Sequence, residues 1–324
     1  MRLFLLCFLL VTHSLINLSA QETDTGESVA AQVKLIPSED RKVLLRFFKR
    51  LFYHGDFSYT LLGQKPMGSI DYNLNLLAVP QFYKEPQKHL FLMALDEKGW
   101  ETWEKYKNFF PLKGYAFIKV KQDSFFGFLL VNKEKTLAVI KDNLSVFQEL
   151  IGEEICASKL LEMLCDGKFG YYHSNTPSLV TYYKVLGLLY GYGEENVRAF
   201  AKRELLIQKL KSLPIEMKSL PLKVMNCLEM EDFSETLEKV QIQNAIGMAS
   251  LASELKNLLD KNCLIKGTKK NNPFLPIKRS QFWGSETCLQ TEAIIENYDK
   301  LNETILRIYE SESFLETILE MLTS

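Results

Sequence analysis

The sequence lacks an excess of charge of either sign, and this limits its partners. Its 324 residues include 39 Lys and Arg against 40 Asp and Glu, so the formal net charge is -1. Such a chain has no long-range field to collect phosphates, and we expect no nucleic acid among its partners. The hydrophobic content of 47% is that of an ordinary globular protein, which argues against disorder in most of the chain.

Motifs for metal, nucleotide and nucleophilic sites are lacking as well. The cysteines have irregular spacings without a CxxC pair, which argues against zinc and thioredoxin-like redox sites. The sequence contains no G-x-S-x-G elbow of the kind that carries a catalytic serine. We therefore predict no metal and no cofactor, and the sequence favours a non-enzymatic protein without deciding the question.

The first 20 residues have the order of a secretory signal peptide. Met1 and Arg2 give a short positive start, residues 3–11 are an unbroken apolar run, and the small residue Ala20 precedes a polar stretch. The run is shorter than the about 20 apolar residues that span a bilayer, so we expect cleavage after Ala20 rather than a retained anchor. This pattern predicts an exported protein, either periplasmic or secreted.

Beyond the signal peptide, no long apolar run remains. The most apolar later stretch, residues 179–192, is interrupted by Lys184, so we predict no transmembrane segment in the mature chain. Five of the six cysteines follow the signal, and an odd number in an oxidising compartment leaves one thiol unpaired or bridged between molecules. Cys263 and Cys288 flank a polar loop and are the best candidates for a disulfide. The alternative is that both are small buried side chains.

The domain organisation predicted for the mature chain is simple. Residues 21–36 are polar and small, which is typical of a flexible leader. One globular body is expected over 37–324, which can be divided into an α+β part (37–141) and a helical part (142–324). Its first helix should begin near Ser38, where an N-cap residue precedes apolar residues at helical spacing. The other face of this helix is basic, so it either packs on the core, which we favour, or lies on an anionic membrane.

The middle of the chain has the pattern of a small sheet. Three extended runs, at 114–121, 125–132 and 136–140, are separated by connections of hairpin length, which predicts a three-stranded antiparallel meander covered by helices. A further strand is expected over 57–63, where apolar residues alternate. Asp96 is expected to cap a helix.

The rest of the chain has helical periodicity. The expected helices are 144–151, 153–164, 177–190, 194–213, 233–259 and 292–322. The fold class is therefore a helix-rich α+β fold with a mostly α-helical C-terminal half. Apolar stripes run along 237–258 and 294–322, and pairing of the two within one chain is the simplest outcome. A homo-oligomer formed through the C-terminal helix is the alternative.

Three residues are candidates for catalytic roles. His54, Asp56 and His173 could supply acid or base groups, and Asp56 could orient His54. A catalytic site also needs geometry that the sequence does not show. The alternative is that Gly55 ends the first helix and Asp56 begins the next turn, while His173 lies in a surface loop.

A glycine-rich elbow between two helices supplies the candidate binding residues. Gly191 and Gly193 give the freedom to turn the chain, and Glu195 lies in the first turn of the next helix. A phosphate cradle is disfavoured there, because Glu195 and its acidic neighbour would repel the anion. Asn196 and Arg203 remain available to bind a ligand at the mouth of this elbow.

Two patches of sequence carry a resemblance to a family. The first runs from the first helix through Tyr59–Pro66, and the second consists of Leu186–Asn196 with Phe200–Arg203. In order and composition these patches resemble uncharacterised exported proteins from obligate intracellular, chlamydia-like bacteria. The resemblance covers roughly the first two thirds of the chain. It implies export from an intracellular bacterium, and it implies no particular activity or fold.

The combined interpretation is an exported binding or interaction protein of the bacterial envelope or secreted space. Its partner would be an unknown protein or small ligand. The alternative is a hydrolase or transferase with a site assembled from loops, in which His54, Asp56, His173 or Glu195 would take the acid or base roles.

Overall fold

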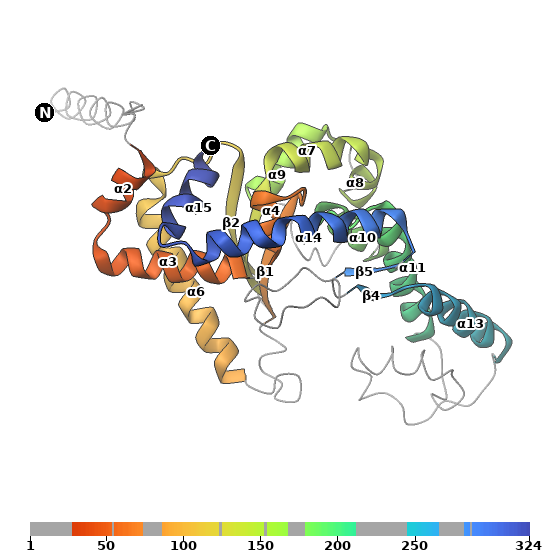
Figure 1. The fold of residues 1–324 in the computed structure, drawn as a ribbon. Helices are drawn as coiled ribbons and strands as arrows, with labels where there is room; N and C mark the ends of the chain where they lie inside the picture. The colour runs from red at the N-terminus through yellow and green to blue at the C-terminus, as the bar shows by residue number, and fades with distance from the viewer. Residues whose placement is uncertain are drawn as a thin grey trace, which may run out of the picture.

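A computed structural model describes residues 28–53, 55–73, 86–122, 125–151, 154–167, 179–211, 245–265, 282–285 and 287–324 (Figure 1). The helices of the first half are α2 (Val29–Leu35), α3 (Ser38–Tyr53), α4 (Gly55–Leu62), α6 (Pro86–Tyr106), the 3-10 turn η1 (Lys107–Phe109), α7 (Lys133–Asp142), α8 (Leu144–Ile151) and α9 (Ala157–Cys165). Those of the second half are α10 (Leu179–Leu189), α11 (Glu194–Lys211), α13 (Ala245–Lys261), α14 (Leu289–Glu310) and α15 (Phe314–Thr323). The strands are β1 (Met67–Asn73), β2 (Tyr115–Gln122), β3 (Phe125–Asn132), β4 (Cys263–Ile265) and β5 (Phe282–Gly284). The predicted signal peptide and the first residues of the predicted leader lie outside the described residues.

The main sheet has three antiparallel strands in the order β1-β3-β2. This confirms the helix-rich α+β class with a small antiparallel sheet, but one strand differs from the expected set. The run 136–140 belongs to helix α7, because the side chain of Asn132 caps that helix by accepting a hydrogen bond from Lys135 N at 3.1 Å. The missing strand is β1, which pairs Met67 with Val131 and Asn73 with Phe125.

The strand predicted over 57–63 is also wrong, since this segment is helix α4. Phe57 and Tyr59 are buried, but Ser58 and Thr60, which would face the other side of a strand, are buried too. The Thr60 hydroxyl donates to the carbonyl of Asp56 at 2.7 Å, a bond between residues four apart that fits a helix. A short helix buried on several sides produces an alternating apolar pattern by chance, and the pattern alone does not separate the two structures.

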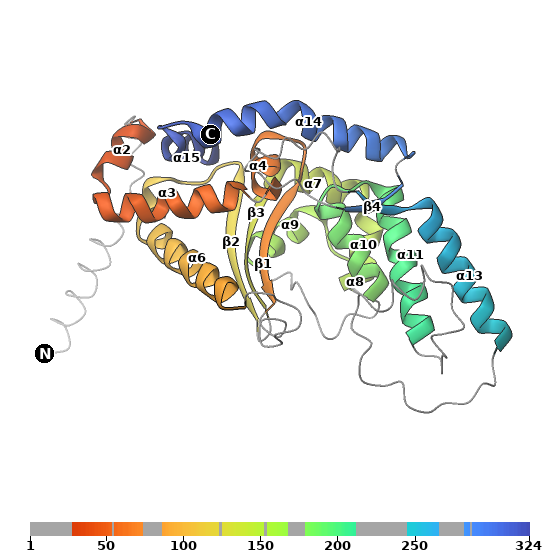
Figure 2. The ribbon, with the colours of Figure 1, turned by 60° about the horizontal axis from the view of Figure 1, so that its bottom comes forward.

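The sheet lies between two layers of helices, and Figure 2 shows α3 and α6 on one side with α7, α9 and α10 on the other. Strand β3 alternates between the two layers. Phe126, Phe128 and Leu130 belong to the core shared with α3, whereas Leu129 and Val131 belong to the core shared with α7–α10. Each face of the sheet therefore closes its own apolar core, which is the two-residue period of a strand buried on both faces.

The two ends of the described chain meet in the first of these cores. Helices α14 and α15 pack on α3 and α4. Helix α14 crosses the middle of the molecule in Figure 1 and runs along its upper edge in Figure 2. The apolar stripe of α14, which includes Tyr298, Ile305 and Ile308, is buried there. Helix α13 packs instead on α11. Residues 237–244 of the first predicted stripe lie outside the described residues. For the described part, α13 and α14 pack on different partners, so the predicted pairing of the two stripes is wrong there.

Of the two predictions for the N-terminal region, one is confirmed and one is wrong. Helix α3 begins at Ser38, and its apolar face is buried, so it is a core helix as we favoured. Part of the predicted leader is ordered, however, because residues 29–35 form α2 and pack on α15. Val33 and Ile36 are each only 1% exposed, and the side chain of Ser28 caps the helix. Burial of these two side chains is what fixes the segment.

Candidate functional site

The two sequence patches of the family resemblance touch each other in the fold. Lys65 and Pro66 precede β1, and the elbow after α10 packs directly on them. Gly191 has a positive φ of 71°, and a Cβ atom there would lie 2.7 Å from Cδ of Pro66. Glycine is required at this position by both the left-handed backbone and the close approach. The sequence predicted the turn at Gly191 but not the segment it contacts.

A pocket of about 320 Å³ lies beside this elbow, between α10, α11 and β5. This volume is at the lower end of the roughly 300–1,000 Å³ typical of small-ligand sites. Six of its lining residues are aromatic. The lining consists of Tyr183, Leu186, Gly187, Tyr190, Tyr192, Asn196, Val197, Phe200, Phe282 and Trp283.

The aromatic rings of the pocket form two connected groups. Tyr192 stacks on Phe282, with ring centroids 5.3 Å apart and an interplanar angle of 14°. Tyr190 stacks on Tyr192 at 5.7 Å, which extends this group toward β1. Phe200 makes edge contacts with Tyr183 at 5.4 Å and with Trp283 at 6.4 Å. These contacts fix the rings of the lining against each other, so the pocket walls are largely pre-formed.

A buried lysine lies behind the first ring group. The Nζ of Lys65 is 4.6 Å from the ring centroid of Tyr192 and 5.3 Å from that of Tyr190. Its charge is balanced by Asp56, whose Oδ1 lies 3.0 Å away. Burial by itself lowers the pKa of Lys65, but attraction by Asp56 and by the neighbouring tyrosines outweighs it, so the pKa is raised. Lys65 is therefore a charged residue beneath the aromatic rings.

An arginine has the corresponding place at the second ring group. The guanidinium carbon of Arg203 lies 5.8 Å from the ring centroid of Phe200 and 5.9 Å from that of Trp283. Its Nη1 pairs with the carboxylate of Glu204, and both side chains are mostly buried. Arg203 was predicted to lie at the mouth of the elbow, and it touches two of the pocket's rings without being part of the lining itself.

Asn196 lines the pocket, yet its amide is used inside the protein. Its Nδ2 donates to the carbonyl of Tyr192 at 2.9 Å and to Oγ1 of Thr291 at 3.0 Å. Its Oδ1 accepts from the Thr291 hydroxyl at 3.1 Å and from Ser285 N at 3.4 Å. Asn196 thus connects α11 to β5 and α14, and it positions the pocket wall rather than offering polar atoms to a ligand.

The two other predicted binding residues lie outside the lining. Gly193 has a φ of 80°, and a Cβ atom there would lie 2.7 Å from the side chain of Gln290. Glu195 is exposed and accepts a hydrogen bond from the thiol of Cys288 at 2.8 Å. Cys263 and Cys288 are both thiols, so the predicted disulfide between them is not formed in this structure. The Cys288 sulfur instead makes a contact across to α11.

Of the three catalytic candidates, the structure places Asp56. It lies in the first turn of α4 and makes the ion pair with Lys65. His54 and His173 lie outside the described residues, so their geometry with Asp56 stays a prediction. Among the described residues, no cluster of three or more His, Cys, Asp and Glu side chains could hold a metal ion. None of the described helices is long and apolar enough to span a bilayer.

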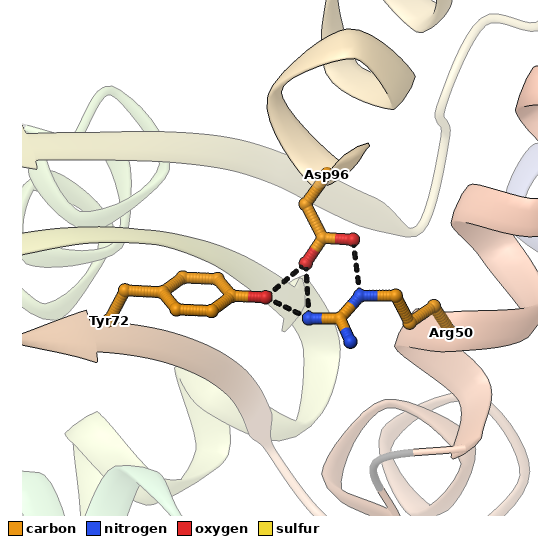
Figure 3. Close-up of polar contacts among 3 residues, drawn as sticks. All are labelled: Arg50, Tyr72 and Asp96. Carbon is orange, nitrogen blue, oxygen red and sulfur yellow. Dashed lines mark hydrogen bonds and ion pairs between the residues drawn. The ribbon is translucent and has the colours of Figure 1, made fainter. Parts of the chain in front are cut away.

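A second polar cluster joins α3, β1 and α6 (Figure 3). Asp96 accepts from Arg50 through two bonds, Nε to Oδ1 at 2.5 Å and Nη2 to Oδ2 at 2.9 Å. The Tyr72 hydroxyl donates to Asp96 Oδ2 at 2.6 Å and also contacts Arg50. Asp96 is inside α6 rather than at its start, so it is not the predicted cap. The cluster satisfies its own charges and serves to fix the two helices to the sheet.

Burial governs the ionisation of this second cluster. Desolvation raises the pKa of Asp96 to about 6, although the charge of Arg50 and its hydrogen bonds oppose the shift. The carboxyl group is fully buried, and its hydrogen bonds go to Arg50 and Tyr72. We therefore assign the cluster a structural role.

The sequence offered only partial signals for the pocket. The patch Leu186–Asn196 with Phe200–Arg203 contains most of the lining, but no pattern in the sequence links Phe282 and Trp283 to it. Phe282 and Trp283 are about 80 residues farther along the chain, and only tertiary pairing brings them to α11.

Comparisons with known proteins gave no further identification, because no family model, no curated protein and no solved structure matches this chain. Any function must therefore be argued from the site itself.

Proposed function

We propose that this protein is an exported bacterial binding protein with no reaction of its own, which holds a small ring-bearing apolar ligand in the aromatic pocket. The observation that supports this is the composition of the lining, with six aromatic residues around about 320 Å³. A pocket that is mostly apolar and largely pre-formed is the usual form of a small-ligand site.

The polar groups near the pocket support binding rather than chemistry. The Asn196 amide bonds within the protein, Tyr190 donates its hydroxyl to Ser69 at 2.6 Å, and Lys65 is paired with Asp56. An acid or base must reach the reacting atom with a proton to give or accept, and these groups are engaged elsewhere. No observation on the described residues favours the hydrolase or transferase alternative.

Export is supported by the order of residues 1–20 and by the family resemblance. Mass spectrometry of the protein isolated from its own cell, together with fractionation, tests this part. We expect a mature N-terminus at Gln21 and recovery from the periplasm or the medium. A cytosolic protein that retains Met1 would overturn the export proposal while leaving the pocket proposal intact.

Binding is tested with a small aromatic probe. We expect indole to bind saturably in isothermal titration calorimetry or saturation-transfer NMR, with the pocket rings as its contacts. Trp283→Ala removes a wall of the pocket and should weaken indole binding at least about tenfold, since one well-placed aromatic contact is worth roughly 0.5–1.5 kcal/mol beyond its buried area.

Phe109→Ala is the matched control, because Phe109 is an exposed aromatic residue that is not in the pocket lining. It should bind indole like the parent protein. The proposal fails if a folded Trp283→Ala variant, checked by circular dichroism, binds indole as tightly as the Phe109→Ala variant. It also fails if indole and a set of larger neutral aromatic compounds show no saturable binding to the parent.

A further inference from the structure

The rings of the pocket already carry the protein's own cations. Four of the six aromatic residues in the lining have a lysine or arginine within 6 Å of the ring centroid. Lys65 lies at Tyr190 and Tyr192, and Arg203 lies at Phe200 and Trp283. Aromatic pockets often bind quaternary ammonium groups, because the negative face of each ring attracts a positive charge. In this pocket the rings attract the protein's own lysine and arginine.

Nothing in the lining would compensate a second positive charge. The described lining residues include no carboxylate. The two carboxylates that pair with these cations, Asp56 and Glu204, are committed to Lys65 and Arg203. A cationic ligand would therefore give up its hydration, meet rings already polarised by a like charge, and find no counter-ion in the described lining.

We infer that the pocket selects an uncharged aromatic ligand and excludes cations of the same shape, and that Lys65 and Arg203 determine this selectivity. The inference rests on the proposed function and specifies its ligand class. Lys65 and Arg203 act through the rings rather than by touching the ligand, so they are positioning residues with an electrostatic effect. A neutral ring stacks on Tyr192 or Trp283 without this penalty.

The test compares two ligands that differ by one charge. 4-tert-Butylphenol and (4-hydroxyphenyl)trimethylammonium have the same shape, and the second is a cation. We expect the parent protein to bind the neutral compound at least about tenfold more tightly at pH 6.5, whereas a bare aromatic cage would favour the cation. The measurement is a pair of titrations by calorimetry or ligand-observed NMR.

Variants separate the effect of the two cations from simple hydrophobic preference. The double variant Asp56→Asn with Lys65→Met removes both charges of one pair, which is milder than removing one partner and leaving the other buried. It should lower the ratio of neutral to cationic affinity by about tenfold, with little change for the neutral compound. Arg203→Met with Glu204→Gln provides the same test at the second ring group, should the first variant fail to fold.

Each outcome has a distinct meaning. The charge selectivity is overturned if the parent protein binds the cation more tightly. It is also overturned if the ratio of neutral to cationic affinity is unchanged in a folded double variant. In both cases the pocket remains a binding site. Failure of both compounds and of indole to bind overturns the proposed function as well. A ratio of neutral to cationic affinity that falls in the double variants supports both the proposed function and the charge selectivity.

Discussion

The ammonium group of Lys65 lies 4.6 Å from the ring centroid of Tyr192, although the two residues are far apart in the sequence. Lys65 is almost fully buried, and Tyr192 also stacks on Phe282 of β5. This contact joins the segment before β1, the elbow between α10 and α11, and the small two-stranded sheet. The position of one charged side chain thereby affects the shape and the electrostatics of the pocket.

The Lys65–Asp56 pair should be important for stability. Asp56→Asn leaves a buried ammonium group without its counter-ion, and we expect the free energy of unfolding to fall by about 3 kcal/mol. Because the pKa of Lys65 is raised in the folded protein, the contribution of the pair is fully present below the unfolded lysine pKa of about 10.4. In the Asp56→Asn variant burial is no longer offset by Asp56, so the unpaired ammonium group loses its proton more easily as the pH rises. Urea titrations should therefore show a loss at pH 9 that is no larger than the loss at pH 6.

Asp142→Asn is the control for this variant, since Asp142 is exposed at the end of α7 and should change stability by less than about 0.5 kcal/mol. Equal stability of the two variants would show that the buried pair contributes nothing.

Gly187 permits the close packing of α10 on α11 at the pocket. A Cβ atom there would lie 2.6 Å from Cγ2 of Val197, so Gly187→Ala must push the helices apart. We expect destabilisation of about 1–3 kcal/mol, measured by thermal unfolding, and weaker indole binding. Val197→Ala in the same chain should restore part of the stability. Gly114→Ala has open space around its Cβ atom and should be neutral, so an equal effect of both alanines would contradict this packing argument.

The Arg50–Asp96 pair should respond to pH. The folded pKa of Asp96, about 6, is above its ordinary value of 3.8, so this carboxyl group contributes stability that is present below pH 4 and is lost as the pH rises through 6. Arg50→Met leaves the carboxylate unpaired, and we expect a loss of about 3 kcal/mol at pH 7 with a smaller loss at pH 5, where Asp96 is protonated.

Chemical denaturation at the two pH values measures this difference. Lys42→Met breaks an exposed pair with Glu39 on the same helix and should lower the free energy of unfolding far less than Arg50→Met does at pH 7. An Arg50→Met deficit that is the same at pH 5 and pH 7 would show that Asp96 does not titrate in this range.

Cysteine reactivity should differ along α9. Cys156 is exposed, and the hydrogen bond with Ser158 together with backbone N–H groups lowers the pKa of its thiol. Burial raises the pKa of the Cys165 thiol at the other end of the helix. Peptide mass spectrometry after brief iodoacetamide treatment at pH 7.5 should show Cys156 modified first. Ser158→Ala should slow that reaction, and faster modification of Cys165 would contradict the assignment.

Local signals in the sequence were sufficient for several elements. The apolar spacing after Ser38 predicted α3, whose first residue is Ser38 itself. Residues 144–151 were predicted as the helix α8 that the structure contains. The runs at 114–121 and 125–132 likewise became β2 and β3. In each case the periodicity or the cap lies within the segment itself, so no distant contact is needed to decide its conformation.

The pattern was insufficient where the partners of a segment decide its structure. Residues 57–61 alternate like a strand, but burial of Ser58 and Thr60 against neighbouring elements makes them part of α4. Asp96 is a residue type that often caps helices, but in the structure it is the buried partner of Arg50. Both outcomes depend on residues distant in the sequence.

The sequence by itself determined the helix-rich α+β class, the near-neutral charge and the glycine elbow, because each follows from composition or from neighbours within a few residues. Only the tertiary structure decided which strand completes the sheet and which rings face one another. It brought Trp283 to Phe200 and Lys65 to Tyr192, and it closed an apolar core on each face of the sheet. Such closure depends on the whole chain, and no local pattern encodes it.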